Sequence, residues 1–316
     1  MKLLILFLFS IIYLYGSILS PNVTPSNIIN MSPLEPIEKT SYALLMDKSS
    51  YTLTLYERTN GSINKVKAYH AIFGKNIGDK FYQGDSRTPE GIYFIHEIKD
   101  EKELLPKYGK KALVLNYPNP MDRLNGKTGL GIWIHSVDDP QRLQLLNDTR
   151  GCVAISNQNI IELSAIVELQ STPVIIVNKP EYINEKTQLS QQAYFLNLLE
   201  KWKTAWINNN IEEYIAFYSD SFYSSAKKMN KKEWRAYKAN LGTIYKNINV
   251  EIDNINIYNF SSYTAILFKQ KYTSPNIQDT GKKIIYLEKT PDSYKIISES
   301  WFAFPSQEAV TVSKKD

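Results

Sequence analysis

Short apolar runs separated by polar turns predict that residues 39–179 form a domain built mostly of β-strands. The first two runs, Tyr42–Met46 and Tyr51–Tyr56, flank the polar residues 47–50 and predict a β-hairpin. Further strands are predicted at Val66–Phe73, Gly91–Ile98, Ala112–Leu115, Gly131–Ile134 and Pro173–Val177. Apolar residues at helical spacing between Asn157 and Gln170 predict one amphipathic helix late in this domain.

The pattern changes after a polar stretch, which predicts a linker at residues 180–191. The second half contains helical patterns first and strand patterns afterwards, which is typical of an α+β domain. The predicted helices are Tyr194–Trp206, Ile211–Tyr218 and Lys232–Leu241. The predicted strands are Ile244–Ile257, Thr264–Tyr272, Lys282–Lys289 and Tyr294–Phe302. We expect this second domain at residues 192–305, with a tail at 306–316.

The first twenty residues have the pattern of a secretory signal peptide. Lys2 precedes the apolar run Leu3–Tyr15, and the small residues Gly16 and Ser17 follow. We expect export with cleavage after Gly16, and hence a periplasmic protein; the alternative is an uncleaved leader that anchors the chain in the membrane. No cysteine near residue 20 could carry a lipid, and residues 21–38, with four prolines, predict an extended tether.

Charge and histidine content narrow the classes of partner. The formal net charge is +5, but the basic residues occur in short pairs such as Lys227-Lys228 rather than in a stripe, which argues against nucleic-acid binding. His70 and His96 have no acidic or cysteine neighbours at ligand spacing, so we expect neither a metal nor another cofactor.

The chain has one cysteine, Cys152, and therefore no internal disulfide. A lone cysteine is most often an inert core residue, but here Gly151 precedes it and His135 ends a predicted strand. Glycine permits a tight turn that presents the sulfur. A nearby imidazole would act as a base and lower the pKa of the thiol. These residues suit a cysteine nucleophile that works with a histidine.

Several motifs in order then resemble the YkuD-type L,D-transpeptidases. The strand ending in His135-Ser136, followed by Thr149-Arg150-Gly151-Cys152-Val153, resembles the active-site signature of this family. Residues 88–91, Thr-Pro-Glu-Gly, resemble its turn into a strand, and Pro173–Val177 resembles its closing strand. The resemblance spans residues 40–178 and implies a YkuD-type catalytic domain acting on the peptide stems of peptidoglycan.

The resemblance also implies roles for individual residues. Cys152 would be the nucleophile, and His135 the general base and acid. The Ser136 carbonyl would orient the imidazole, and the N–H groups of Gly151 and Cys152 would form the oxyanion hole. The residues implied to bind substrate are Thr88, Trp133, Thr149 and Arg150.

Two positions depart from the family pattern. Ser136 stands where the family often has glycine, and Ala154 where it often has arginine. We expect Arg150 to replace the missing cation.

Residues 192–305 resemble the nuclear-transport-factor-like (SnoaL-like) cone domain. The resemblance lies in the spacing of aromatic residues such as Trp202, Trp206 and Trp234, and in the final strand with Glu299 and Trp301. These aromatics could line a pocket for an unidentified ligand, but their spacing favours core packing.

The two-domain arrangement resembles L,D-carboxypeptidases that trim stems in curved and helical Gram-negative bacteria. Three functions follow as alternatives. We favour an L,D-carboxypeptidase that trims tetrapeptide stems to tripeptides through a cysteine thioester. The others are an L,D-transpeptidase that forms crosslinks and an inactive wall-binding scaffold.

Overall fold

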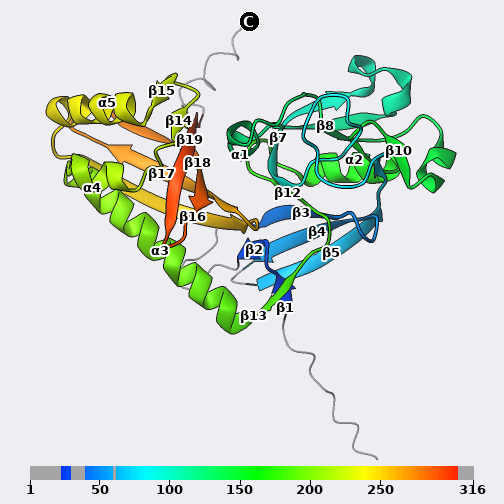
Figure 1. The fold of residues 1–316 in the computed structure, drawn as a ribbon, viewed down its shortest axis with the longest axis horizontal. Helices are drawn as coiled ribbons and strands as arrows, with labels where there is room; N and C mark the ends of the chain where they lie inside the picture. Colours follow the sequence, from blue (N-terminus) through cyan, green and yellow to red (C-terminus); the bar gives the residue numbers. More distant parts are fainter. Residues whose placement is uncertain (1–22, 30–39, 60–61, 305–316) are drawn as a thin grey trace, which may run out of the picture.

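The computed structural model describes residues 23–29, 40–59 and 62–304, and in it two β-sheets pack against each other face to face (Figure 1). The larger sheet has eight strands and belongs to the first domain. In order of hydrogen-bonded neighbours, its strands are β11 (Val153–Ala154), β9 (Trp133–His135), β8 (Lys111–Leu115), β7 (Gly91–Asp100), β12 (Pro173–Val177), β3 (Ser41–Asp47), β4 (Thr52–Thr59) and β5 (Ser62–His70). This confirms the mostly-β prediction and the predicted hairpin, because β3 and β4 pair antiparallel.

Short elements lie around the large sheet. Helix α2 (Asn157–Ile166) packs on one of its faces, where Ile160 and Leu163 join a core of strand residues. The remaining elements of the first domain are β6 (Phe73–Gly74), η1 (Glu101–Glu103), η2 (Pro106–Tyr108), α1 (Pro120–Leu124), η3 (Pro140–Gln144) and β10 (Asn147–Thr149).

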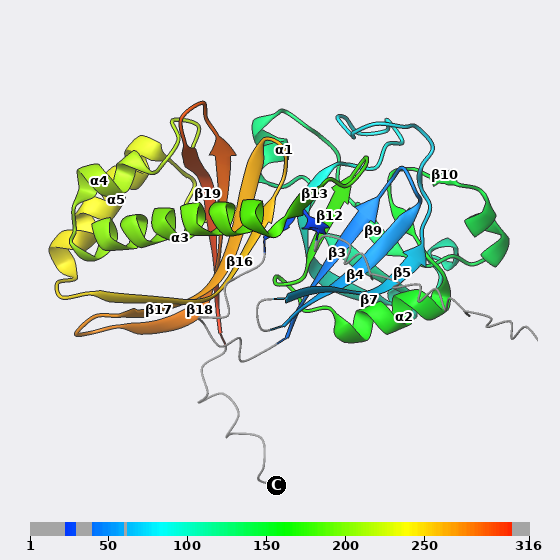
Figure 2. The same cartoon turned by 90° about the horizontal axis from the view of Figure 1, so that it is seen from below.

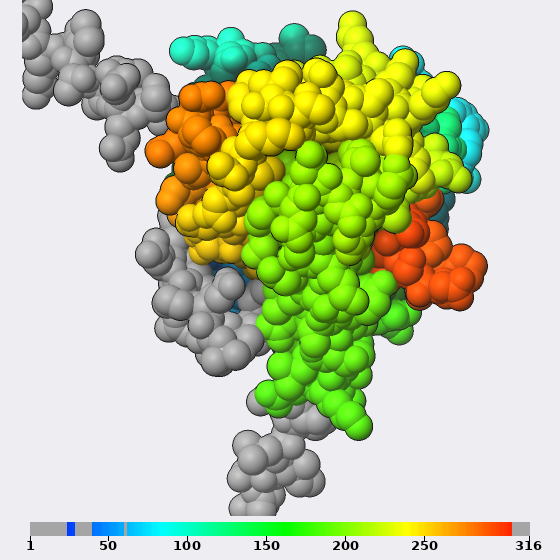
Figure 3. All heavy atoms as spheres, turned by 90° about the vertical axis from the view of Figure 1, so that its left-hand side faces the viewer, coloured from blue at the N-terminus to red at the C-terminus, as the bar shows by residue number. Residues whose placement is uncertain are grey.

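The second domain confirms the predicted α+β arrangement. Its sheet consists of β19 (Tyr294–Ala303), β18 (Gln278–Lys289), β17 (Tyr263–Thr273), β16 (Asn249–Asn259) and the N-terminal β2 (Ile28–Ile29). Three helices cover one face of this sheet around Trp202, which is fully buried (Figures 2 and 3). They are α3 (Glu185–Ile207), α4 (Ile211–Ala216) and α5 (Lys231–Ile244), and the short β14 (Tyr223–Ser224) and β15 (Met229–Asn230) lie between the last two.

The opposite face of the second sheet packs on the first domain. Tyr258, Tyr263 and Tyr286 of the second domain share one buried cluster with Ile92 and Ile175 of the first. An apolar interface of this kind opposes relative motion of the domains. The domains are therefore joined through a common core as well as through the chain.

The predictions for two connecting segments are wrong, because both segments contain regular structure. The linker 180–191 contains β13 (Tyr182–Asn184) and the start of α3, whose first turn is capped by Asn184 accepting a hydrogen bond from the Thr187 N–H at 3.0 Å. The sequence of these turns resembles a linker because the residues on their buried face are polar. Gln188 and Gln192 are buried there, and the Gln188 side-chain amide donates to the Ile28 carbonyl at 3.1 Å.

The predicted tether 21–38 also contains regular structure. Residues 23–29 form β1 (Val23–Pro25), which pairs with β13, and β2, which pairs with β16. The predicted leader 1–20 and tail 306–316 lie outside the described residues. Among the residues that are described, no helix has the length and apolar character needed to cross a membrane.

Candidate active site

The two residues predicted to carry the chemistry lie at neighbouring strand ends of the large sheet. His135 is the last residue of β9, and Cys152 immediately precedes β11. The two strands run parallel, with Ala154 opposite His135. Residues two apart on a strand point to the same face. The register, continued back to Cys152, therefore places this residue on the face that carries His135.

The turn that presents Cys152 is held by its own side chains and its own backbone. Gly151 has a φ of 124°, and a Cβ there would lie 2.6 Å from the Arg87 carbonyl oxygen, so glycine is required at this position. The Thr149 hydroxyl donates to the Cys152 carbonyl at 2.6 Å and accepts from the Gly151 N–H at 3.1 Å. Conformation and hydrogen bonds together fix the backbone next to the sulfur.

The Cys152 thiol lies in an environment that raises its pKa. It donates to the Gly131 carbonyl at 3.5 Å. Burial raises the pKa of the thiol above its usual value, while the Trp133 backbone N–H and the charges of Lys80 and Lys107 act in the opposite direction. Because burial is the largest of these effects, the pKa of the thiol is raised overall. The expectation that the imidazole lowers it stays a prediction.

The His135 imidazole is buried and oriented by the backbone. Its Nδ1 lies 2.5 Å from the Ser136 carbonyl oxygen, which requires a proton on Nδ1 and leaves Nε2 free to accept one. The ring of Tyr108 packs edge-on against it at 5.0 Å and also lies 5.0 Å from the ring of Trp133. Burial lowers the pKa of His135 to about 4, so the imidazole is a neutral base at neutral pH.

This low pKa predicts the acidic limb of the pH profile. If neutral His135 is the base, kcat/KM should stay high from pH 7 down to pH 5 and fall as the pH drops through about 4, where the imidazole becomes protonated. An ordinary histidine would place this limb near pH 6.5. The measurement is kcat/KM between pH 3 and 8, with circular dichroism at each pH to exclude unfolding. A limb near 6.5 would contradict the buried neutral imidazole.

The residues implied to bind substrate or an oxyanion differ in their exposure and in their hydrogen bonds. Arg150 is exposed and Trp133 is half-buried beside Tyr108, so both are accessible. Thr149 is buried, and its hydroxyl stabilises the cysteine turn by donating to the Cys152 carbonyl. The Gly151 N–H is occupied by the Thr149 hydroxyl, whereas the Cys152 N–H has no acceptor among the described residues. The Cys152 N–H is thus the more available donor for an oxyanion.

Thr88 does not reach the surface, so its predicted contact with substrate is wrong. Its side chain is fully buried, and its hydroxyl accepts from the Gly74 N–H at 2.9 Å. Its carbonyl accepts from the Lys48 ammonium at 3.1 Å. Thr88 therefore supports the loop beside the cysteine turn rather than contacting a ligand.

Tyr108, in the loop of residues 101–111, was not identified from the sequence as part of the site. Gly109 follows with a φ of 65°, and a Cβ there would lie 2.3 Å from the Ser136 hydroxyl oxygen. That hydroxyl accepts from the Lys110 N–H at 2.7 Å and donates to the Tyr108 carbonyl at 3.3 Å. The departure at Ser136 thus ties the loop to the catalytic strand. No local sequence signal connects this loop with His135 and Ser136, because they lie far from it along the chain.

The aromatic residues of the second domain form its core, as their spacing predicts. Trp202 is fully buried and packs against Phe268, and Trp234 is 5% exposed. Beside this core, Lys283 lies 3.4 Å from the Glu299 carboxylate. Trp206 and Lys238 line a cavity of about 520 Å³, and burial lowers the pKa of Lys238 to about 8. A ligand of this cavity remains a prediction.

Comparisons with known proteins agree with both domains. The L,D-transpeptidase catalytic domain (YkuD) matches residues 41–176, and the Cds6 C-terminal NTF2-like domain matches residues 194–300. The Escherichia coli K12 protein YafK, named as a candidate L,D-transpeptidase, is 28% identical over 123 residues, which are 38% of this chain. This chain spans only 44% of the length of YafK.

Two solved structures extend over both domains. Bd1075 of Bdellovibrio bacteriovorus is 33% identical, with a TM-score of 0.76, and the match covers 90% of this chain and 100% of that one. The helical cell shape determining protein Pgp2 of Campylobacter jejuni is 27% identical, with a TM-score of 0.67, and the match covers 87% of this chain and 95% of Pgp2. The chain therefore belongs to the L,D-transpeptidase (YkuD) family, as a two-domain member with a C-terminal NTF2-like domain.

Proposed function

We propose that this protein is a cysteine L,D-carboxypeptidase that trims tetrapeptide stems of peptidoglycan to tripeptides. The observation that carries the proposal is the fixed turn that presents Cys152 at the strand next to that of His135 and on the same face, together with the orientation of the imidazole by the backbone. This arrangement supplies a nucleophile, a base and a backbone donor, which acyl transfer requires. Family membership supports the choice of substrate.

In the proposed reaction, His135 Nε2 takes the thiol proton as Cys152 attacks the carbonyl of the L-centre of diaminopimelate. The Cys152 N–H stabilises the oxyanion. When the tetrahedral intermediate collapses, the bond to the terminal D-Ala breaks, and the imidazolium protonates the leaving amine. Water then attacks the thioester with His135 again as base, which releases the tripeptide and restores the thiol. The low pKa of His135 favours fast return of its proton.

The loop that carries Tyr108 supports water as the acceptor. The ring of Tyr108 lies against both His135 and Trp133, and the Ser136 hydroxyl holds the loop in place. A second stem must reach the thioester beside the imidazole, and bulk at this position excludes it more strongly than it excludes water. An acceptor that cannot be oriented loses the large effective concentration that transfer requires.

The test is incubation of the purified protein with tetrapeptide muropeptides and an excess of an amine acceptor. We expect tripeptide and free D-Ala as the main products by mass spectrometry. Crosslinked dimers as the main product would establish the transpeptidase instead. No turnover would support the inactive scaffold.

Shortening Tyr108 should change the ratio of the two outcomes. In Tyr108→Ala the acceptor side opens, so we expect the share of amine-transfer product to rise several-fold while attack on the donor stem continues. The ratio of transfer to hydrolysis is read at a fixed amine concentration. Leu105→Ala, an exposed position in the same loop, is the matched control and should leave the ratio unchanged. An unchanged ratio in Tyr108→Ala would remove this loop from the explanation.

We further propose that the protein acts in the periplasm, since its substrate is there and its first residues have the pattern of a signal peptide. The likeness to Pgp2, which is a cell shape determining protein, supports a role in cell shape. Fractionation of producing cells, with mass analysis of the mature N-terminus, tests both the location and the cleavage after Gly16.

A further inference from the structure

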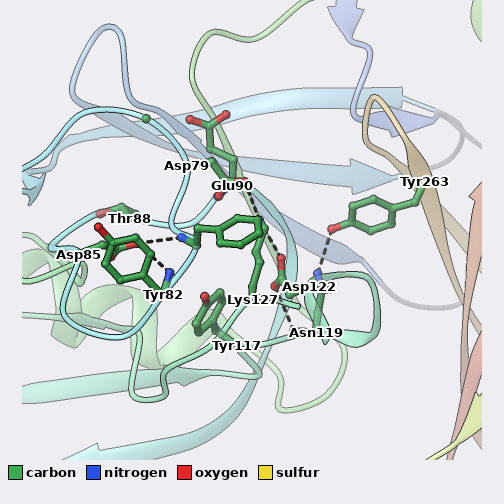
Figure 4. Close-up of polar contacts among 12 residues, drawn as sticks. Asp79, Tyr82, Asp85, Thr88, Glu90, Tyr117, Asn119, Asp122, Lys127 and Tyr263 are labelled. Atoms are coloured by element: carbon green, nitrogen blue, oxygen red, sulfur yellow. Dashed lines mark hydrogen bonds and ion pairs between the residues drawn. The ribbon is translucent and has the colours of Figure 1, made fainter. Parts of the chain in front are cut away.

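A tyrosine of the second domain is inserted into the polar interior of the first. Tyr263 is the first residue of β17 and is 3% exposed. Its hydroxyl accepts hydrogen bonds from the Ile92 N–H at 2.6 Å and from the Asn119 side-chain amide at 2.9 Å (Figure 4). A Cβ at Gly91 would lie 2.8 Å from this hydroxyl, so the backbone of β7 approaches it as closely as only glycine permits.

Hydrogen bonds and an ion pair connect Tyr263 with residues 119–127, and the same segment ends at Gly131, which contacts the sulfur. Asn119 caps α1 by accepting from the Asp122 N–H at 2.8 Å. Asp122 lies 3.0 Å from the Lys127 ammonium, and the segment then continues to Gly131. The carbonyl of Gly131 is the acceptor of the Cys152 thiol. The start of this segment is therefore held by the second domain, and its end contacts the nucleophile.

A second set of contacts leads into the loop of residues 74–91. Lys127 also pairs with Asp79 at 2.5 Å, and Asp79 accepts from the Glu90 N–H at 2.8 Å (Figure 4). The Glu90 carboxylate lies 2.8 Å from the Lys48 ammonium. This ammonium also donates to the Thr88 carbonyl at 3.1 Å.

The same loop supports the turn of the nucleophile. The Arg87 carbonyl lies against Gly151, and the Lys75 N–H donates to the Thr149 carbonyl at 3.0 Å. Within this loop Asp85 pairs with the Lys80 ammonium at 2.7 Å, and the charge of Lys80 acts on Cys152. Tyr263 thus contacts Asn119 at the start of one segment that borders the cysteine and Ile92 directly after the end of the other.

We propose that Tyr263 is a positioning residue, through which the second domain holds the two segments that flank Cys152. The inference rests on the proposed function insofar as it concerns turnover. The physical reason is that the buried Ile92 N–H donates to this hydroxyl, while the Asn119 side-chain amide donates both to it and to the Ile92 carbonyl. Without the hydroxyl, the Ile92 N–H is left without a partner and the Asn119 amide keeps only its bond to Ile92. An unpaired buried group is driven to rearrange towards water or another acceptor. Gly131 and residues 74–91 are then no longer held in fixed positions.

The test compares Tyr263→Phe with Tyr286→Phe in the full chain. Tyr286 is a second buried tyrosine of the same interface, but among the described residues its hydroxyl makes one long hydrogen bond, which it accepts from the Asn116 side-chain amide at 3.4 Å. Two quantities are measured well below the unfolding temperature of each variant. One is kcat and KM on tetrapeptide muropeptides, and the other is the pH dependence of Cys152 alkylation by iodoacetamide.

For Tyr263→Phe we expect kcat to fall about tenfold with a smaller change in KM, because a misplaced nucleophile slows the chemical step more than binding. We also expect the thiol to titrate closer to its ordinary pKa, because loosened segments admit water to a sulfur whose pKa burial now raises. Tyr286→Phe should leave both quantities as in the wild type.

A merely structural tyrosine would lower the unfolding temperature and leave both quantities unchanged, and that result would overturn the proposal. If Tyr263→Phe does not fold, Asn119→Ser replaces it, since serine still caps α1 but lacks the side-chain amide that donates to Tyr263 and to the Ile92 carbonyl. The same two results are expected for it. Alkylation needs no substrate, so a wild-type protein that fails to turn over muropeptides would reject the proposed function while the thiol titration still decides the role of Tyr263.

Discussion

Replacing Cys152 with alanine should reduce turnover of tetrapeptide stems by a factor of about 10⁴ or more, to the limit of detection. In the proposed reaction the sulfur forms the covalent intermediate, and no other described side chain at the site can replace it. Ser136, the nearest hydroxyl along the chain to His135, is buried and engaged with the Lys110 N–H and the Tyr108 carbonyl. The measurement is release of D-Ala and tripeptide over time by mass spectrometry.

Folding provides the control for this variant. The thiol makes one weak hydrogen bond, to Gly131, so Cys152→Ala should keep the circular dichroism spectrum and unfold within a few degrees of the wild type. A variant that folds and still trims stems at more than about a hundredth of the wild-type rate would reject covalent catalysis by Cys152. A wild type and a variant that are equally inactive would support the wall-binding scaffold.

The strands and the order of the motifs could be predicted from the sequence because their signals are local. The hairpin of β3 and β4 follows from two apolar runs around Asp47, whose carboxylate accepts from the N–H groups of Ser49 and Ser50 in the turn. The start of α3 could not be predicted in this way. Its first buried residues are glutamines, and the partner of Gln188, the Ile28 carbonyl, lies 160 positions earlier in the chain.

The site was predictable in its composition but not in its electrostatics. His135 and Cys152 were identified from the motifs, and the Ser136 carbonyl was expected beside the imidazole, where it is found. The raised pKa of the thiol depends on how completely the fold excludes water, which no local pattern encodes. Tyr108 and Tyr263 were missed for a similar reason, because each acts on residues far from it in sequence.

Replacing His135 with alanine should lower kcat/KM by about 10²- to 10⁴-fold, the range typical of a general base. The effect should be large here because burial raises the pKa of the thiol, which increases its need for a base to take the proton. In the proposed reaction the same imidazole also protonates the leaving amine, so both the attack of the thiol and the departure of the amine should be slower. In addition, the fall in activity near pH 4 should disappear in this variant, since it belongs to the titration of His135.

Ser136→Gly is the matched control for the role of the neighbouring backbone. It keeps the carbonyl that orients Nδ1 and removes only the hydroxyl that holds the Tyr108 loop. We therefore expect Ser136→Gly to keep kcat/KM within about tenfold of the wild type and to retain the acidic limb near pH 4. Activity of His135→Ala within threefold of the wild type would show that another group takes the thiol proton. If Ser136→Gly instead lost as much activity as His135→Ala, the hydroxyl rather than the carbonyl would control the base.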